Sequence, residues 1–190
     1  MRARDFLKDN DDNEHRAQLQ KTGFWGRAAA GSILYCPDTG RFCLAHRSSA
    51  VQEPDTWGMW GGAMDSGESP EDAARRELVE ETAYTGPAEF HPLWTFEHSS
   101  GFRYYNFLAI VEREFRPRMD WETQGYRWFD INDSRDWPSP LHPGVKKLLS
   151  RQDVMSQLLS LKPDRQAVSE GLAKPYLEKI IQSFVNSEIG

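Results

Sequence analysis

The order of apolar and polar positions along the chain predicts strands first and helices later. WGRAAAGSILYC (25–36) is a run of small and apolar residues, PDTG (37–40) is turn-forming, and RFCLAHRS (41–48) alternates between apolar and polar positions. Alternation with a period of two is typical of a strand with one buried face, and a short turn joins antiparallel neighbours. These segments therefore predict a β-hairpin.

Later segments predict more strands, because they are rich in aromatic and β-branched residues that pack well on a pleated surface. They comprise a short extended piece that ends in a glycine pair and three longer runs: WGMWGG (57–62), AEFHPLWTFEH (88–98), FRYYNFLAIVEREF (102–115) and YRWFDIN (126–132). The tight SSG turn between the first two of the longer runs predicts that they pair with each other.

One helix is well marked in the middle of the chain, between Pro70 and Ala83. Ser69 is a good N-cap, proline suits the first helical position, and acidic residues fill the first turn. Ala74 and Leu78 lie four residues apart and give a thin apolar stripe that can dock on a sheet. HPGVKKLLS (142–150) predicts a second helix.

Strands before and after a helix, with another helix later, predict an α/β fold: an α/β/α sandwich in which helices cover both faces of a mixed sheet. We expect the main domain to span residues 24–150, because 190 residues suffice for one full core. Residues 1–23 predict a charged N-terminal arm. Residues 151–190 contain the helical patterns QDVMSQLLSL and PYLEKIIQSFV and predict a C-terminal helical extension, which extends the core or forms a homodimer or partner contact.

Composition narrows the class of partner. The chain is 38% hydrophobic, 12% aromatic and 27% charged, with a net charge of -6. We therefore expect no general binding to nucleic acid or to anionic membranes, since both need an excess of Lys and Arg. With no signal-peptide pattern and no run near the ~18 apolar residues of a spanning helix, we predict a cytoplasmic protein. Cys36 and Cys43 are expected to be reduced thiols.

Acidic residues crowd on the predicted helix. At 100° per residue, Glu77, Glu80 and Glu81 share an arc of about 100° and repel by roughly 0.2–0.5 kcal/mol per pair. A hard divalent cation offsets this repulsion, and carboxylates suit Mg²⁺ or Mn²⁺, which bridge to phosphate. We prefer a metal site to a solvated charged face, because three carboxylates lack three basic partners. Arg76 can hold one of them from the side.

The stretch Gly62–Tyr84, GAMDSGESPEDAARRELVEETAY, resembles the Nudix box, G-x5-E-x7-R-E-U-x-E-E-x-G-U with U a bulky apolar residue. The matched positions are Gly62, Glu68, Arg76, Glu77, Leu78, Glu80 and Glu81. With residue frequencies of ~5%, chance agreement over the chain is on the order of 10⁻⁶. The resemblance implies the Nudix fold over residues 24–150.

Three positions depart from the family pattern. Ala83 replaces the glycine that usually ends the helix, and we expect it to continue the helix by one residue, with Gly86 as the stop. Tyr84 fills the last apolar position. Trp60 precedes the glycine pair where the family often has proline, which predicts an unusual pocket wall.

The resemblance implies an enzyme that hydrolyses a phosphoanhydride in a nucleoside diphosphate-linked substrate with Mg²⁺ or Mn²⁺. It further implies these roles: Glu77, Glu80 and Glu81 bind metal, the Gly62 carbonyl completes the site, Arg76 orients a glutamate, and Glu68 ties the loop to the helix. The general base is left open between Glu77, Glu81 and a carboxylate of the later loop. In that loop Glu122 is the first candidate and Asp120 the second.

Substrate recognition needs cations for phosphate and planar rings for a base. Arg47 and Arg103, at strand ends, are candidate phosphate contacts, although a solvated strand-end charge is the commoner state of any single arginine. The candidate stacking rings are Trp57, Trp60, Phe102 and Tyr105, and the alternative for each is a place in the core. The histidines show no zinc-site spacing.

The substrate class stays open between a nucleotide sugar, a dinucleotide and a capped or triphosphorylated RNA end. The net charge makes the RNA end the weakest of these, although REFRPR (113–118) is a local basic cluster. The alternative function is a Nudix-like nucleotide sensor or protein-interaction module without turnover. The presence of all three helix carboxylates argues against it.

Overall fold

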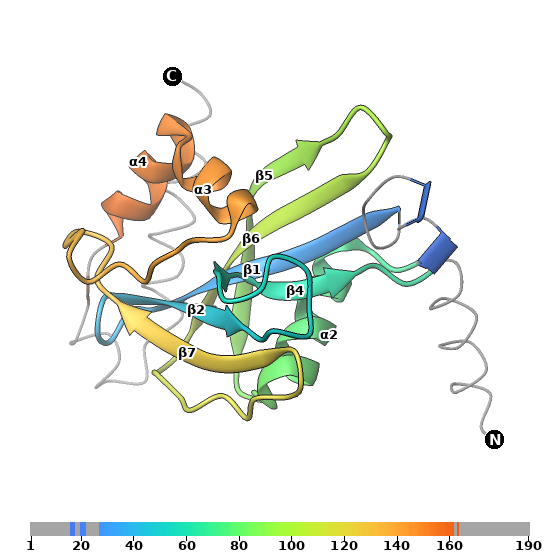
Figure 1. The fold of residues 1–190 in the computed structure, drawn as a ribbon. Coiled ribbons are helices and arrows are strands. Elements are labelled where there is room, and N and C mark those ends of the chain that lie inside the picture. The colour runs from blue at the N-terminus through green and yellow to red at the C-terminus, as the bar shows by residue number, and fades with distance from the viewer. Residues whose placement is uncertain (1–15, 18–19, 22–26, 162, 164–190) are drawn as a thin grey trace.

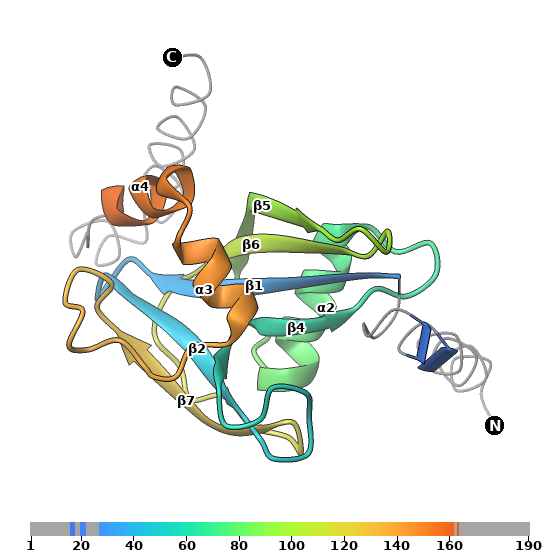
Figure 2. The same cartoon turned by 45° about the horizontal axis from the view of Figure 1, so that its top comes forward.

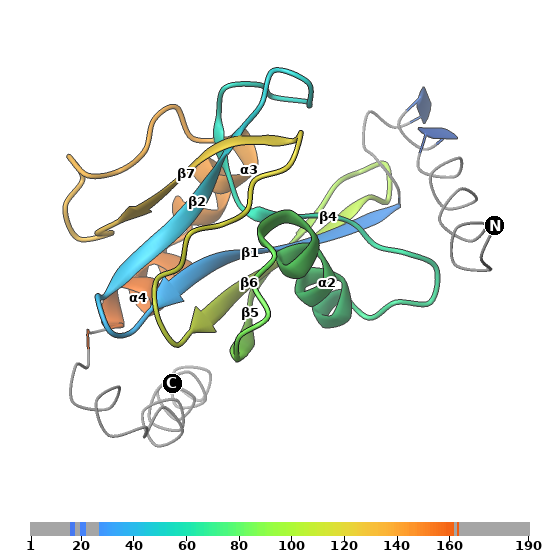
Figure 3. The same cartoon turned by 90° about the horizontal axis from the view of Figure 1, so that it is seen from below.

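A computed structural model describes residues 16–17, 20–21, 27–161 and 163. One mixed sheet lies between α2 on one face and α3 and α4 on the other (Figures 1, 2 and 3). The prediction of an α/β sandwich with a mixed sheet is confirmed. The predicted arm 1–23 and the second helical pattern of the extension lie outside the described residues, apart from residues 16–17 and 20–21 of the arm.

Seven strands form the sheet in the order β3-β2-β1-β6-β5, with β4 paired to β1 and β7 paired to β2. Their bounds are β1 Ala28–Cys36, β2 Arg41–Arg47, β3 Trp57–Gly58, β4 Trp60–Ala63, β5 Ala88–Glu97, β6 Arg103–Val111 and β7 Thr123–Phe129. The β1–β6 pair is parallel, and the other pairs are antiparallel. The predicted pairing of 88–98 with 102–115 is confirmed by β5 and β6.

The predicted hairpin is present but short. Strands β1 and β2 pair only from Leu34↔Cys43 to Cys36↔Arg41. The first half of β1 pairs instead with β4, from Ala29↔Ala63 to Ser32↔Trp60. The far edge of β4 is therefore left without a strand partner in the sheet order, and α2 lies along this edge.

Helix α2, Pro70–Thr82, begins as predicted, with the Ser69 hydroxyl accepting the Asp72 N–H. Its end differs from the prediction. Ala83 does not continue the helix but takes the left-handed conformation, with φ 58°, and its N–H bonds to the Val79 carbonyl. Ala83 thus adopts the backbone shape for which glycine is suited, and the helix stops without Gly86.

Helices α3, Pro143–Leu149, and α4, Gln152–Ser160, pack together on the other face. From α4, Val154 and Leu158 are buried in the same core as Leu148 of α3. This packing argues for extending the domain past residue 150, which the 3.6-residue period of a helix cannot reveal. Cys36 and Cys43 are free and buried, as predicted. None of the described helices has the length and apolar character that a membrane crossing needs.

His142 is the N-cap of α3, and its Nδ1 accepts the Gly144 N–H at 3.0 Å. Accepting this bond requires the neutral ring. Burial, with the nearby charge of Arg47, lowers the pKa of His142 to about 4, against about 6.5 in an unfolded chain. The cap is therefore sensitive to acid.

Lowering the pH from 7.5 to 5 should cost the wild-type protein about 1 kcal/mol of stability relative to His142→Asn, after allowing for solvent screening. Below pH about 6.5, His142 binds a proton in the unfolded chain, whereas in the folded chain it stays neutral until the pH approaches its lowered pKa. Stability is thus full above that pH and is lost as the pH falls toward the folded pKa. Asparagine caps a helix without titrating. Urea unfolding of both proteins at both pH values measures the difference; equal losses would contradict this account.

Candidate active site

Helix α2 lies against the free edge of β4 and bonds to it at two points. The Gly61 N–H donates to Glu81 Oε2 at 2.9 Å, and Arg76 Nη2 donates to the Ala63 carbonyl at 2.9 Å. These bonds satisfy backbone groups that an unpaired strand edge would otherwise leave open. They also fix which side chains of the helix reach the strand.

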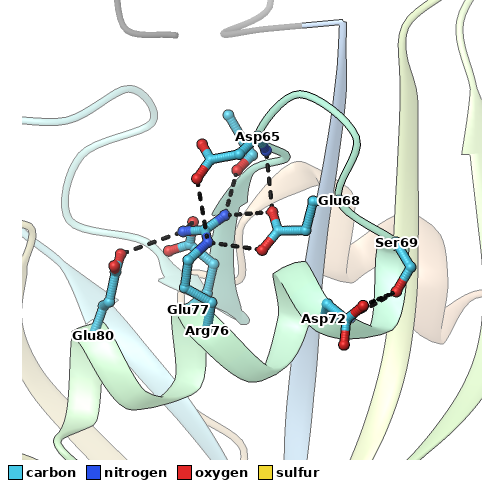
Figure 4. Close-up of polar contacts among 8 residues, drawn as sticks. Asp65, Glu68, Ser69, Asp72, Arg76, Glu77 and Glu80 are labelled. Carbon is cyan, nitrogen blue, oxygen red and sulfur yellow. Dashed lines mark hydrogen bonds and ion pairs between the residues drawn. The ribbon is translucent and has the colours of Figure 1, made fainter. Parts of the chain in front are cut away.

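Arg76 is the centre of a network of acidic side chains (Figure 4). Its guanidinium forms a two-bond fork to Glu68, with both distances 2.9 Å, and contacts Glu77 Oε1 at 2.7 Å and Glu80 Oε2 at 3.3 Å. Glu68 also accepts the Asp65 N–H at 3.0 Å. Arg76 therefore contacts Glu77 on the helix and Glu68 in the loop before it. The resemblance implied that Arg76 orients a glutamate and that Glu68 ties the loop to the helix, and these contacts are of that kind.

The Glu77 and Glu81 side chains are partly buried, and their carboxyl groups are largely withdrawn from solvent. Burial, with smaller contributions from the charges of Glu80 and Glu122, raises the pKa of Glu77 to about 7 despite Arg76. Burial raises the pKa of Glu81 well above its usual range, and the charges of Glu77 and Glu122 add to the effect. Within the described ranges, no Lys, Arg or His forms an ion pair with Glu81. The negative charge of this pair is thus only partly compensated by protein.

Glu80 differs from its two neighbours. Its side chain is 48% exposed, and Figure 4 shows it at the margin of the network, joined to Arg76. The predicted convergence of three helix carboxylates is therefore uneven, because two lie partly buried against β4 and the third lies at the rim. A role for Glu80 in metal binding stays a prediction.

The backbone beside the carboxylates corrects one expectation. In an antiparallel ladder the N–H and C=O of one residue point to the same edge, and successive residues alternate. Because Gly61 N–H and Ala63 C=O face α2, the groups of Gly62 face β1, where Gly62 pairs with Ala30. The same alternation turns the Gly61 carbonyl, rather than that of Gly62, toward the carboxylates. The sequence alone does not show which glycine of the pair turns its carbonyl toward α2, because this depends on the register between β1 and β4.

Gly62 has a different requirement. A Cβ at this position would lie 2.7 Å from Glu77 Oε1 and 2.9 Å from its carboxyl carbon. These separations are too short for a side chain, so glycine is needed to let the Glu77 carboxylate reach the strand.

The loop between β6 and β7 brings a further carboxylate to α2. Figure 3 shows this loop passing the end of α2, where the Arg118 N–H bonds to the Thr82 carbonyl at 2.9 Å. Directly before β7, the Glu122 carbonyl accepts the Ser48 N–H at 2.8 Å. The charge of Glu122 acts on both Glu77 and Glu81, and its own pKa is raised by burial and by Asp120. The structure thus brings Glu122, the first loop candidate for general base, to the helix carboxylates.

The two candidate phosphate-binding arginines lie in different surroundings. Arg47 follows a bulge in β2, donates to the Gln52 carbonyl, and lowers the pKa of Glu122 by its charge. It therefore lies near the carboxylates. Arg103 forms an exposed ion pair with Glu97 at 3.1 Å across the end of the β5–β6 hairpin. Phosphate binding by either residue stays a prediction.

The structure corrects two of the proposed stacking residues. Trp60 is 0% exposed within the core under α2, and Phe102 is 7% exposed. Neither ring presents a face to a ligand, because both side chains are buried. Trp57 is partly buried and stacks on His46 with ring centres 4.5 Å apart. Tyr105 packs against the core under α2.

The donor set fits a hard divalent cation. Partly buried carboxylates with raised pKa values, beside the Gly61 carbonyl that the strand alternation turns toward them, are ligands of the kind that Mg²⁺ and Mn²⁺ prefer. No group of three His, Cys, Asp or Glu side chains already stands at metal-holding distances in the part of the chain that the structure describes. Arg76 contacts Glu77, and Glu81 accepts the Gly61 N–H. Binding a cation would therefore require these carboxylates to share or exchange their present partners.

Comparison with known proteins gives consistent results. A family model described as a NUDIX domain matches residues 26–152. A Mycobacterium tuberculosis protein, provisionally named 8-oxo-dGTP diphosphatase 3, is 45% identical over 131 residues, which cover 64% of this chain and 59% of that protein. A Caulobacter vibrioides protein named RNA pyrophosphohydrolase is 33% identical over 103 residues, covering 54% of this chain and 55% of that protein. The chain thus spans less than two thirds of the length of these relatives.

Solved structures show the same fold. A Nudix hydrolase from M. smegmatis, RenU, superposes with a TM-score of 0.59 at 27% identity, covering 70% of this chain and 88% of that one. A C. elegans Ap4A hydrolase has a TM-score of 0.54 at 24% identity, covering 70% of this chain and 98% of that one. The second likeness concerns the fold alone.

Proposed function

This chain belongs to the Nudix family, and from that premise we propose that it hydrolyses a phosphoanhydride bond in a nucleoside diphosphate-linked substrate with Mg²⁺ or Mn²⁺. The observation that supports this most strongly is the burial of Glu81 beside Glu77 without a cationic partner among the described residues. Burying such charge costs stability. A bound divalent cation would compensate this negative charge and would in turn bind a polyphosphate.

Substrate class is part of the proposal. A nucleoside triphosphate is the first candidate, because the relative with 45% identity carries the name of an 8-oxo-dGTP diphosphatase. An RNA end is the second candidate, because the Caulobacter relative carries the name of an RNA pyrophosphohydrolase. The net charge of -6 favours the smaller substrate, since a longer RNA needs more positive surface.

Each group at the site has a distinct task in this reaction. Glu77, Glu81 and the Gly61 carbonyl would hold the cation, with Glu80 at the rim. A bound divalent ion would neutralise charge on the phosphate oxygens and help to ionise the attacking water. Arg76 keeps Glu77 in position through its own bonds to Glu68 and Ala63. Arg47, beside Glu122, would offer positive charge to an outer phosphate.

We assign the general base to Glu122. Its carboxyl group is half-buried near Glu81, and its backbone is held by Ser48 on a neighbouring loop. A raised pKa makes a carboxylate a stronger base at neutral pH. Glu77 and Glu81 are the alternatives, but cation binding would occupy them.

Glu122→Gln should lower kcat by about 10²–10⁴-fold, the range for loss of a positioned base, and leave nucleotide affinity nearly unchanged. Steady-state kinetics with calorimetric binding measures both quantities. Asp120→Asn is the matched control, because Asp120 lies two residues away and its side chain accepts the Glu122 N–H. If Asp120→Asn lost the activity and Glu122→Gln kept it, the base would be Asp120.

The substrate itself is found by a panel assay. The purified protein, with Mg²⁺ or Mn²⁺, is offered dGTP, 8-oxo-dGTP, diadenosine tetraphosphate, ADP-ribose, a nucleotide sugar and a triphosphorylated RNA. We expect release of phosphate or pyrophosphate from the triphosphates, abolished by EDTA. Tight retention of a nucleotide with no product, unchanged by Glu81→Gln, would support the alternative function of a nucleotide sensor.

The assembly of the protein is a separate proposal. The end of the extension 151–190 can supply a homodimer contact, although residues 164–190 lie outside the described part. Light scattering of the full chain tests this.

A further inference from the structure

The loop that carries Glu122 packs little of its own surface against the core. The four residues directly before Glu122, 118–121, all have exposed side chains, and the Trp121 side chain is 67% exposed. Glu122 itself lies one residue before β7, outside any helix or strand. A segment with few buried apolar contacts is held in one place mainly by its hydrogen bonds. The position of the Glu122 carboxylate therefore depends on the bonds made by the backbone around it.

Ser48 supplies two of these bonds from a part of the chain 73 residues away. Its hydroxyl donates to the Trp121 carbonyl at 2.8 Å, and its N–H donates to the Glu122 carbonyl at 2.8 Å. The hydroxyl oxygen also accepts the Ala50 N–H at 3.2 Å, which fixes the side chain in this orientation. The two carbonyls belong to the peptide groups on either side of the Glu122 Cα. One residue thus holds the backbone both before and after the candidate general base.

The sheet keeps Ser48 itself in place. Strand β2 pairs with β7 as far as Arg47↔Thr123, with a bulge just before this last pair. Ser48 follows directly and carries the contact one residue beyond the ladder. The Gln124 side chain supports the same point, because its Nε2 donates to the Arg47 carbonyl at 3.0 Å and to Asp55 Oδ1 at 2.7 Å. The serine hydroxyl is therefore presented to the Glu122 loop from a segment tied to the sheet.

Charge gives these bonds a task. The negative charge of Glu122 acts on both Glu77 and Glu81. Like charges repel, so a loop free to move would carry Glu122 away from the helix carboxylates. A general base must instead lie within hydrogen-bond reach of the proton that it takes. The bonds from Ser48 oppose the displacement that the charges favour.

We propose that Ser48 is a positioning residue for hydrolysis, whose hydroxyl holds the Glu122 carboxylate in its working position through the bond to the Trp121 carbonyl. This rests on the proposed function, with Glu122 as its general base. Ser48 acts through Glu122 and is assigned no contact with the substrate. Because the bond affects the reacting step rather than binding, its loss should lower kcat and leave KM nearly unchanged.

Ser48→Ala tests this by removing only the hydroxyl. With Mg²⁺ and dGTP, or with the panel substrate that the wild type turns over fastest, kcat should fall by roughly 10–10²-fold, the scale of a small misplacement of a reacting group. KM should stay near the wild-type value, and so should the affinity for the α,β-imido analogue of dGTP measured by calorimetry. Ser48→Thr keeps a hydroxyl at this position and should retain most of the wild-type kcat.

Ser150→Ala is the matched control. The Ser150 hydroxyl also donates to a backbone carbonyl at 2.8 Å, that of Lys147, in an exposed position at the end of α3. The change is therefore chemically the same but lies on another element. We expect wild-type kinetics from it, and we expect both alanine variants to melt at nearly the same temperature.

A double variant shows whether Ser48 acts through Glu122. In the Glu122→Gln protein, adding Ser48→Ala should cause no further loss of kcat, because the group that it positions is already absent. The inference would be overturned by equal kcat values in the two alanine variants, by a failure of threonine to retain activity, or by a further loss in the double variant. Wild-type turnover would leave the proposed function standing in each of these cases. A wild-type protein that turns over no substrate of the panel would overturn both.

Discussion

Replacing Glu81 with glutamine should abolish hydrolysis and, in metal-free buffer, make the protein more stable. We expect kcat/KM to fall by at least about 10³-fold, the scale of losing one preorganised electrostatic group in an active site. We also expect about 1 kcal/mol of added stability, or a melting temperature about 2–4 °C higher. The reason is that the Glu81 carboxyl group is withdrawn from solvent beside Glu77 and forms no ion pair of its own among the described residues.

The stability gain should depend on pH in a definite direction. The folded-state pKa of Glu81 is raised, so below about pH 4.5 the carboxyl group is protonated in both states and the substitution changes little. As the pH rises, the unfolded chain ionises freely while the folded chain must keep a proton or bury a charge. The advantage of Glu81→Gln should therefore grow from pH 4.5 to 8. Urea unfolding in EDTA at several pH values measures it.

Glu71→Gln is the control for this experiment. It makes the same change in the first turn of α2, where Glu71 is exposed and pairs with Arg75. We expect near wild-type activity and stability. A Glu81→Gln protein that lost stability at pH 8 would contradict the view that this carboxylate is held at a cost.

Replacing Arg76 with alanine should have the opposite effect on stability and the same effect on activity. Arg76 bonds to Glu68, Glu77, Glu80 and the Ala63 carbonyl, and only 25% of its side chain is exposed. Its loss would leave Glu68 and Glu77 as poorly compensated, partly buried charges. We expect a cost of about 3 kcal/mol, or roughly 6–12 °C in melting temperature, together with a large loss of kcat because Glu77 is no longer oriented.

Arg75→Ala is the matched control, because Arg75 is the neighbouring arginine on the same helix. Its side chain is 44% exposed, and it contacts Glu71, the Ala88 carbonyl and the Phe90 ring. Its removal should cost under about 1 kcal/mol and leave activity intact. Thermal melts and kinetics on the two variants compare the sites directly. Similar costs in both would show that the Arg76 network adds no more than an ordinary surface pair.

Local signals in the sequence were sufficient for α2 and its acidic face. Ser69 and Pro70 act within one helix and its preceding loop, so they predict the cap and the helix start. The resemblance to the Nudix box implied that Glu68 ties this loop to the helix, and its bonds to Arg76 do so. The β5–β6 pair was equally accessible, because a tight turn joins its strands. Such features depend on neighbours in the chain.

Features that depend on the register between distant strands could not be predicted from the sequence. The division of β1 between β2 and β4 decides that Gly61, rather than Gly62, turns its carbonyl to the carboxylates. The same register places Tyr104 over Gly31, and nothing in the spacing of these residues predicts that contact. The burial of aromatic residues could not be predicted either. An aromatic residue such as Trp60 gives no sign of whether its face of the strand meets the core or solvent.

The central claim is that Glu77 and Glu81 bind divalent cations against a polyphosphate, and one calorimetric titration tests it most directly. Mn²⁺ is titrated into wild-type protein and into Glu81→Gln, each saturated with a non-hydrolysable imido nucleotide. We predict saturable uptake by the wild type and uptake weakened by at least about tenfold in the variant. Identical isotherms, or no uptake by the wild type, would contradict the claim.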